Sequence, residues 1–281
     1  MFSHVLAPVD GSGPANRAAT IARELGGLFD ATVTVLHVES DVPRRDDESA
    51  GETILESAVT PRIEGEPTVR TRLETGRPDR VVANVVESEP VDLVVMGRRG
   101  RRGLSRRVLG SVTERVLRNV AVPVLTVDGG SGARDTIADA GTMVLTTDGS
   151  EESERVAEPA RAFATTLDAT VQYLSVVDLH AAAGPFDAGG LSPSFVEALE
   201  DDAAAAIDRL ADRVGAPAER TVVRRGSPSE EIVTYVNETG VDLLAMASEG
   251  QTNIAGQVIG SVTRRVLQGT SIPVLVVPVV D

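Results

Sequence analysis

The chain has 281 residues, no cysteine and a formal net charge of −15, so disulfides, zinc ribbons and thiol catalysis are excluded. The acidity also argues against general nucleic-acid binding, which needs a broad basic face. Because 42% of the residues are hydrophobic and only 2% are aromatic, the core has to be aliphatic, as in parallel sheets covered by helices.

Strand and helix patterns alternate from the N-terminus onward. Short β-branched runs predict strands at 4–10, 31–38, 67–74, 91–96 and 122–127, and apolar residues at helical spacing predict helices at 14–25 and 111–119. Gly26 suits the end of the first helix. Apolar strands separated by helices indicate an α/β fold with a parallel sheet, whose ligand sites lie at the carboxyl ends of the strands.

The second half of the chain repeats the first. The segment VDLVVMGRRG at 91–100 returns as VDLLAMASEG at 241–250. The segment VLGSVTERVL at 108–117 returns as VIGSVTRRVL at 258–267, and both pairs are offset by 150 residues. Self-similarity at one fixed offset indicates a duplicated unit.

The offset is smaller near the start of each copy. Asp10 corresponds to Asp148, an offset of 138 residues, so the second copy contains an insertion, which we place in 178–194 and interpret as a loop. The predicted organisation is a domain at 1–128, a linker at 129–141 and a second domain at 142–281.

The first strand-to-helix junction is PVDGSG, in which Asp10 ends a strand and a Gly-Ser-Gly turn leads into a helix. The turn begins like a dinucleotide fingerprint, but Asn16 stands where the third glycine belongs. One interpretation is an Asp–Gly turn with Ser12 as the helix cap. The other, favoured by the recurrence of Asp10 as Asp148, is a carboxylate that accepts a hydrogen bond from a ribose hydroxyl or an adenine amine.

The second junction contains three glycines, Gly97, Gly100 and Gly110, which let the backbone approach a phosphate closely. Ser111 with Glu114 forms a capping-box pattern, so we expect a helix to start there and to point its first amides at the bound group. Six arginines would add charge-assisted contacts to a polyphosphate: Arg98, Arg99, Arg101, Arg102, Arg106 and Arg107. For the last two, a solvated helix face that pairs with surface carboxylates is the alternative that we favour.

The spacing G-x2-G-x9-G-S after a strand that ends in Met-Gly resembles the ATP-binding branch of the universal stress protein family, as do the early PVDGS and the strand VPVLTV. The resemblance covers essentially the whole chain, as a tandem of two UspA-like domains. It implies two Rossmann-like domains of the adenine nucleotide alpha hydrolase-like type. Each would have a five-stranded parallel sheet flanked by helices.

The resemblance also implies a ligand, ATP with or without Mg²⁺, and the residues that bind it. Asp10 and Val38 would flank adenine and ribose, and the glycines would hold ribose and phosphates. The expected nucleotide-binding residues of the first copy are Pro8, Asp10, Val38, Met96, Gly97, Gly100, Arg101, Gly110, Ser111 and Val112. Those of a second, weaker site are Asp148, Val176, Met246, Gly250, Gly260, Ser261 and Val262.

The second copy departs from the pattern where the ligand would bind. Ala247 replaces the first glycine, Glu249 adds a negative charge near the phosphates, and Arg264 replaces the capping-box acid. The extra Cβ of an alanine is tolerated only if the residue has ordinary backbone dihedrals. We therefore predict unequal sites, with ATP bound in the first copy and with weaker, absent or altered binding in the second.

The usual machinery of phosphoryl transfer is missing, because a chain without lysine has neither a Walker P-loop nor a kinase lysine. The histidines, His4, His37 and His180, form no metal-spaced cluster. Ser12 and Ser111 lack a base partner for a hydrolase triad. We expect no catalytic or metal-ligating residues, and at most slow ATP hydrolysis.

Three functions follow as hypotheses. The leading one is a stress-response regulator or sensor whose ATP-bound and empty states present different surfaces to protein partners. The second is a non-catalytic interaction scaffold with vestigial nucleotide sites. The third is a nucleotide-dependent transferase, for which only the insertion at 178–194 could build a second pocket.

Assembly and location follow from the ends of the two copies. In the family the last strand commonly pairs with its counterpart in a dimer, so the resemblance implies an intrachain pseudo-dimer through 122–127 and 273–280, with a further homodimer left open. The N-terminus lacks a signal-peptide pattern, and the apolar run at 272–280 is too short to span a bilayer. We expect a cytoplasmic protein that binds neither membrane nor nucleic acid.

The charge pattern predicts a halophilic protein. All 27 basic residues are arginine, and an acidic surface without lysine keeps a protein soluble in concentrated salt, where repulsion among carboxylates is screened. We expect the melting temperature to rise across a salt series, measured by calorimetry. Higher stability in low salt would contradict the prediction.

Overall fold

A computed structural model describes residues 2–39, 50–60, 63, 65, 67–100, 108–130, 135–183, 191–216, 218–250 and 259–279. Its contacts divide the chain into two compact units. The first unit is Met1–Ala140 with Ser271–Asp281, and the second is Gly141–Thr270. The contacts of the final strand therefore assign it to the first unit.

The first unit is a sheet with helices between its strands. Its elements are β1 (His4–Val9), α1 (Gly13–Phe29), β2 (Thr32–Glu39), α2 (Ala50–Val59), β3 (Val69–Thr75), α3 (Pro78–Ser88), β4 (Leu93–Gly97), α4 (Ser111–Asn119), β5 (Val124–Val127) and, from the end of the chain, β10 (Val274–Val277). The strand order is β3-β2-β1-β4-β5-β10. The five strands of the first copy are parallel, as predicted.

The last strand, β10, is antiparallel to the other five strands of the first unit. Val274 lies opposite Thr126 and Val276 opposite Val124 in an antiparallel ladder between β10 and β5. The prediction that the final strands of the two copies pair within one chain is confirmed for these residues. Antiparallel pairing at this position closes the β5 edge of the sheet, which would otherwise offer unpaired backbone groups.

The second unit repeats the arrangement. Its elements are β6 (Thr142–Thr147), α5 (Glu151–Glu154), α6 (Ala157–Leu167), β7 (Thr170–Val177), α7 (Leu179–Ala183), α8 (Pro193–Val214), β8 (Ala218–Arg225), α9 (Pro228–Thr239), β9 (Leu243–Ala247) and α10 (Ser261–Gly269). The four strands are parallel in the order β9-β6-β7-β8. The α/β class and the tandem arrangement of two units are confirmed.

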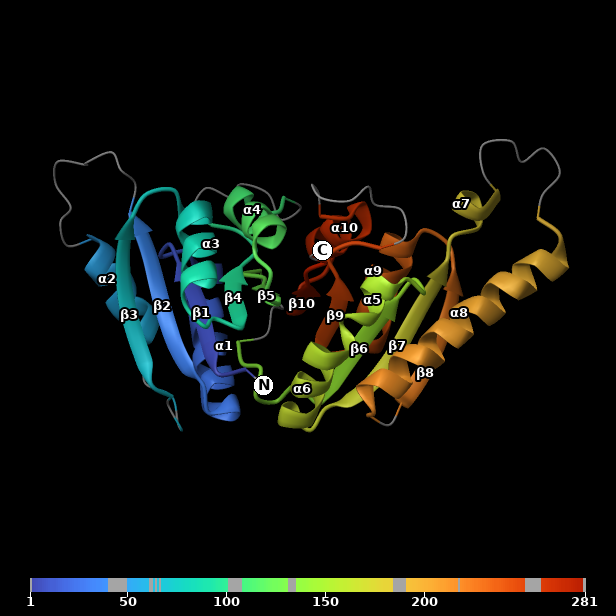
Figure 1. The fold of residues 1–281 in the computed structure, drawn as a ribbon, viewed down its shortest axis with the longest axis horizontal. Helices are drawn as coiled ribbons and strands as arrows, with labels where there is room; N and C mark the ends of the chain where they lie inside the picture. The colour runs from blue at the N-terminus through green and yellow to red at the C-terminus, as the bar shows by residue number, and fades with distance from the viewer. Residues whose placement is uncertain are drawn as a thin grey trace. The chain divides into compact units, whose positions relative to one another are not determined.

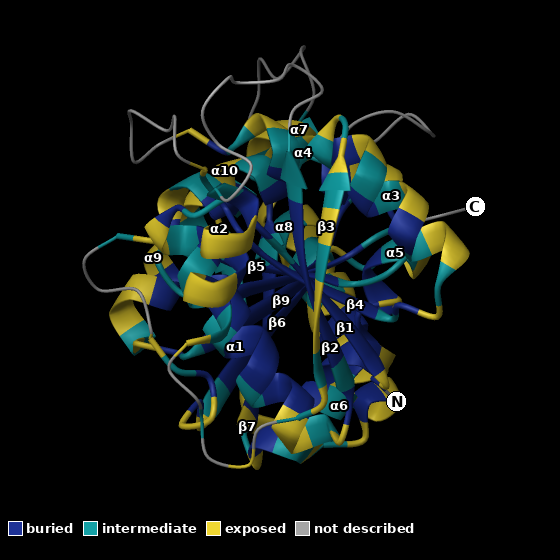
Figure 2. Ribbon diagram, turned by 90° about the vertical axis from the view of Figure 1, so that its left-hand side faces the viewer, coloured by how far each residue is buried: buried dark blue, intermediate teal, exposed yellow. Residues whose placement is uncertain are grey.

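Helices cover both faces of each sheet (Figure 1). In the first unit α1 packs with α2 and α3 packs with α4, and in the second α6 packs with α8 and α9 with α10. The central strands β1 and β4 are therefore buried, whereas the edge strand β3 is largely exposed (Figure 2). The core is aliphatic, as the composition predicted, with Leu6, Leu36 and Leu93 fully buried.

The prediction that Gly26 ends the first helix is wrong. Helix α1 continues to Phe29, and Asp30 ends it in the left-handed conformation, at φ 56°. Gly26 is instead a packing position, because a Cβ there would overlap with Val33 and lie 2.8 Å from Pro67 Cγ. A sequence pattern cannot distinguish a glycine that ends a helix from one that lets a helix approach a strand.

The interpretation of 178–194 as a loop is wrong at both ends. Helix α7 occupies Leu179–Ala183, and Asp178 Oδ1 accepts hydrogen bonds from the first amides of this helix, His180 N and Ala181 N, both at 3.0 Å. Helix α8 already begins at Pro193, and Ser192 caps it. Residues 184–190 of the predicted loop lie outside the described residues.

The described part of the predicted linker is attached to the first unit. Glu24 Oε2 accepts hydrogen bonds from Thr136 Oγ1 at 2.9 Å and from Ile137 N at 2.7 Å, and the side chain of Ile137 is fully buried. Arg17 Nε pairs with Asp135 at 2.8 Å. The segment after β5 is therefore held against α1.

The tight contact at Gly26 predicts a change in stability. We expect Gly26→Ala to lower the free energy of unfolding, because overpacking costs about 1–3 kcal/mol and outweighs the roughly 1 kcal/mol that alanine gains in helix propensity. Gly13→Ala is the control, because no atom lies within 4 Å of a Cβ there. Urea unfolding measures both, and equal effects of the two variants would contradict the packing role.

Candidate functional site

The site begins at the carboxyl end of β1, where Asp10 follows the strand. Asp10 Oδ1 accepts hydrogen bonds from Ser12 N at 3.0 Å and from Ser12 Oγ at 2.6 Å. Ser12 Oγ in turn caps α1, accepting from Ala15 N at 3.4 Å. The Asp–Gly turn with a serine cap, one of the two interpretations, is therefore present, and Gly11 at φ 76° supplies the left-handed residue that it needs.

The loop after β4 returns to the same carboxylate. A Cβ on Gly100 would overlap with Asp10 Oδ2, so only glycine allows this approach. A Cβ on Gly97 would lie 2.8 Å from the carbonyl carbon of Pro14, in the first turn of α1. The glycines thus let the carboxyl end of β4 lie against both Asp10 and the start of α1.

The end of the loop is anchored to its beginning. Gly110 N donates to Arg98 O at 2.7 Å, and Thr113 Oγ1 donates to Gly97 O at 2.8 Å. A Cβ on Gly110 would lie 2.9 Å from Arg98 O. These bonds fix the position at which α4 starts, directly beside the end of β4.

Helix α4 starts where predicted, but the capping box is wrong. Gly110, not Ser111, is the N-cap, no side chain caps the helix, and Ser111 is its first residue. Glu114 pairs with Arg118 at 3.3 Å. The first-turn amides therefore have no side-chain cap from the described residues, and such amides at the positive end of a helix favour an anion.

Two of the arginines do not act as expected. Arg98 is 2% exposed, its Nε donates to Thr126 Oγ1 at 3.1 Å, and its guanidinium also donates to Ile272 O. The expectation that Arg98 contacts a polyphosphate is therefore wrong. Arg99 pairs with Asp128, and both of these side chains are largely buried.

The buried guanidinium is electrostatically costly. Burial, and then the nearby charge of Arg99, lowers the pKa of Arg98 to about 9. The group still carries its charge at neutral pH, and its hydrogen bonds offset part of the desolvation. The other arginines of the cluster, Arg101, Arg102, Arg106 and Arg107, lie outside the described residues.

The remaining expected residues lie at the same edge of the sheet. Pro8 is in β1, Val38 in β2 and Met96 in β4, three neighbouring strands, and Val112 is in the first turn of α4. His37 Nδ1 donates to Val9 O at 2.7 Å and is 8% exposed, so this histidine stabilises the strand ends. Every expected residue of the first site except Arg101 is described, and these residues lie on β1, β2 and β4, in the turns after β1 and β4, or at the start of α4.

The second unit repeats this framework. Asp148 Oδ1 accepts from Ser150 N at 3.1 Å, and a Cβ on Gly250 would overlap with Asp148 Oδ2. Gly260 N donates to Ser248 O at 2.9 Å, and Gly260 is the N-cap of α10 without a side-chain cap. The other expected residues, Val176, Met246, Ser261 and Val262, lie on β7, β9 and the first turn of α10.

The second unit differs at the start of its first helix. Ala247 has no positive φ, so its methyl group is tolerated by the backbone. The helix that corresponds to α1 is divided, however, into the four-residue α5 and the longer α6, with a turn at Arg155 and Val156. The long helix that lies against Gly97 in the first unit therefore has no uninterrupted equivalent beside Ala247.

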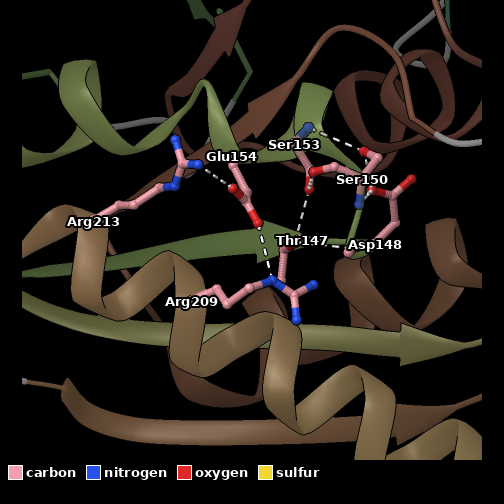
Figure 3. Close-up of polar contacts among 8 residues, drawn as sticks. Thr147, Asp148, Ser150, Ser153, Glu154, Arg209 and Arg213 are labelled. Atoms are coloured by element: carbon pink, nitrogen blue, oxygen red, sulfur yellow. Dashed lines mark hydrogen bonds and ion pairs between the residues drawn. The ribbon is translucent and has the colours of Figure 1, made fainter.

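A polar network that the sequence analysis missed surrounds α5 (Figure 3). Thr147 Oγ1 and Ser153 Oγ are 2.8 Å apart, next to the Asp148–Ser150 turn. The carboxylate of Glu154, whose side chain is 8% exposed, pairs with Arg209 at 3.2 Å and with Arg213 at 2.8 Å. The two arginines are four residues apart on α8, a helical spacing that was the only available sequence signal.

Comparison with known proteins decides the family. The model of the universal stress protein family matches residues 1–128 and 140–278. The chain belongs to the universal stress protein family. A universal stress protein of Mycolicibacterium smegmatis is 27% identical over 97% of this chain and 96% of its own length. One of Thermus aquaticus is 31% identical over 45% of this chain and 99% of its own length.

Solved structures of the family have the same fold. A universal stress protein from Archaeoglobus fulgidus superimposes with a TM-score of 0.69 and 17% identity, covering 98% of each chain. At this identity the likeness concerns the fold alone. Among the described residues of this family member, no helix is long and apolar enough to cross a membrane, and no three His, Cys, Asp or Glu residues are grouped as a metal site.

The Glu154 network predicts a stability effect in the second unit. Glu154→Gln removes the charge that two arginines share, so we expect the free energy of unfolding to fall by about 1–3 kcal/mol. Glu151→Gln is the matched control, an exposed acid in the same helix. Denaturant unfolding distinguishes them, and an unchanged Glu154→Gln midpoint would show that the network contributes nothing.

Proposed function

We propose that this universal stress protein is an ATP-binding regulator or sensor of a stress response, with the first unit as the better nucleotide site. The observation that carries the proposal is the approach of Gly100 to Asp10, beside a helix whose first amides have no side-chain cap. A carboxylate, a close glycine backbone and such amides meet at one edge of a parallel sheet, where these folds bind ligands.

Each group has a distinct role in this proposal. Asp10 accepts a hydrogen bond from ribose or adenine, Val38 flanks adenine and ribose, and Met96 borders the site. Gly97, Gly100 and Gly110 bring the backbone near the phosphates, and the amides of Ser111 and Val112 donate to them. Bound Mg²⁺ would neutralise phosphate charge, and Arg101, outside the described residues, stays a prediction as a phosphate contact.

The differences between the first and second units support unequal nucleotide sites. The second unit has the Asp148–Gly250 approach, but Glu249 lies next to it, and the helix after Asp148 is the short α5. A carboxylate beside a polyphosphate is repulsive, and four residues make a weak helix terminus. Binding to the second unit is therefore proposed to be weaker, absent or altered in preference.

The runner-up is a protein interaction scaffold with vestigial nucleotide sites. The roles of Arg98 and Arg99 favour it, since two of the six clustered cations stabilise the protein itself. A further homodimer, the protein partners and a cytoplasmic location stay predictions, and no more than slow ATP hydrolysis is proposed.

Calorimetric titration with Mg-ATP at high salt tests the proposal. The wild type and Gly250→Val should bind ATP, whereas Gly100→Val should not, because its side chain would occupy the space beside Asp10. Loss of binding in Gly250→Val with normal binding in Gly100→Val would overturn the assignment of the better site. No binding by any of the three proteins would favour the scaffold. Melting curves show whether each variant is folded.

A further inference from the structure

The two units differ at one pair of helices outside the nucleotide site. In the first unit Asp79, in the first turn of α3, is 4% exposed and pairs with Arg77 at 3.0 Å and with Arg115 of α4 at 3.7 Å. With the 150-residue offset, the corresponding residues of the second unit are Ser227, Ser229 and Arg265. The second unit thus keeps the arginine of the last helix and lacks the carboxylate that it faces.

A hollow lies at this place in the second unit. Its volume is about 480 Å³, and the residues that line it come from α9 and α10: Ser229, Glu230, Val233, Thr234 and Arg265. Ser229 is 3% exposed, yet no described residue forms a hydrogen bond with its hydroxyl group. In the described part of the chain Arg265 has no ion-pair partner either, although its counterpart Arg115 has one.

The groups around the hollow suit an anion. Ser229 is in the first turn of α9, whose N-cap Ser227 makes no side-chain cap hydrogen bond, so the positive end of the helix is close, although Glu230 and Glu231 also lie in this turn. The Ser229 hydroxyl and the Arg265 guanidinium, both of which line the hollow, add further donors. The first unit shows which anion fits this framework, because the carboxylate of Asp79 occupies the equivalent place there.

Glu230 limits the charge of the ligand. It is exposed at the rim of the hollow, and its counterpart in the first unit is Arg80. Its negative charge opposes Arg265, so a second negative charge on the ligand would be disfavoured. The hollow is open to solvent, so it would hold a small ligand at the surface and not enclose it.

We propose that the hollow between α9 and α10 is a binding site for a small organic monocarboxylate, whose carboxylate takes the place that Asp79 occupies in the first unit. Arg265 and the hydroxyl of Ser229 bind the carboxylate, and Val233 contacts the apolar part of the ligand. The proposal does not depend on nucleotide binding, because these residues are separate from the Asp148–Gly250 site.

Titration with ¹³C-labelled acetate, followed by NMR of the ligand, tests the site. The wild type should bind acetate, and Arg265→Gln should bind it roughly tenfold more weakly or not at all, as expected for loss of a charge-assisted contact. Ser229→Asp should also lose acetate binding, because the new aspartate side chain would itself occupy the place of the ligand carboxylate beside Arg265. Adding Asp79→Ser to Ser229→Asp should restore binding, now in the first unit.

The controls separate this site from the nucleotide site and from misfolding. Acetate should raise the melting temperature of the wild type but not that of Ser229→Asp, and Mg-ATP binding should be the same in both. Phosphate should bind more weakly than acetate, and Glu230→Gln should reduce the difference. If Arg265→Gln and Ser229→Asp bind acetate like the wild type, or if phosphate binds more tightly than acetate, the proposal is wrong.

Discussion

The close approach of backbone segments at the carboxyl edge of the first sheet determines most of what this structure can bind. A side chain at Gly100 would overlap with Asp10, and one at Gly97 or Gly110 would lie within 3 Å of neighbouring backbone. Those three glycines hold β1, the start of α1 and the start of α4 together without any side chain between them. Among the described residues, the polar groups at this edge include the Asp10 carboxylate and the first amides of α4, a combination that suits a ligand with hydroxyl or amine donors at one end and an anion at the other.

Duplication shows which parts of that edge can vary independently. The Asp148 turn, the Gly250 approach and the uncapped start of α10 follow the first copy almost contact for contact. The helix after the carboxylate varies, because α5 ends after one turn and Glu154 binds it to α8 through Arg209 and Arg213. The second unit therefore attaches α5 to α8 at the place where the first unit has an uninterrupted helix.

The α/β class and the tandem arrangement could be predicted from the sequence, because alternation of apolar runs and an internal repeat are properties of whole segments. The β5–β10 pairing was implied by the resemblance to the family. Apart from the helical ends of the predicted loop at 178–194, the errors concern single residues. Gly26 is a residue type that commonly ends helices, but here it packs against Val33. Ser111 fits the sequence pattern of an N-cap, but the N-cap is the preceding residue, Gly110. Glu154 had no local signal, since its partners lie 55 residues and more away.

The arginines that follow β4 in the first unit include residues that stabilise the protein itself. The spacing of arginines in the sequence does not distinguish these residues from ones that contact a ligand. Arg98 joins the end of β4 to Thr126 of β5 and to Ile272 just before β10, and Arg99 joins the same loop to Asp128. Both residues thereby attach the start of the glycine loop to β5 and to the residues that follow β5 and precede β10. On a chain without lysine, arginine has to supply these structural cations as well as any that meet a ligand. A count of basic residues near a binding motif therefore overstates the charge available to phosphate, and burial at Arg98 is the feature that reveals the difference.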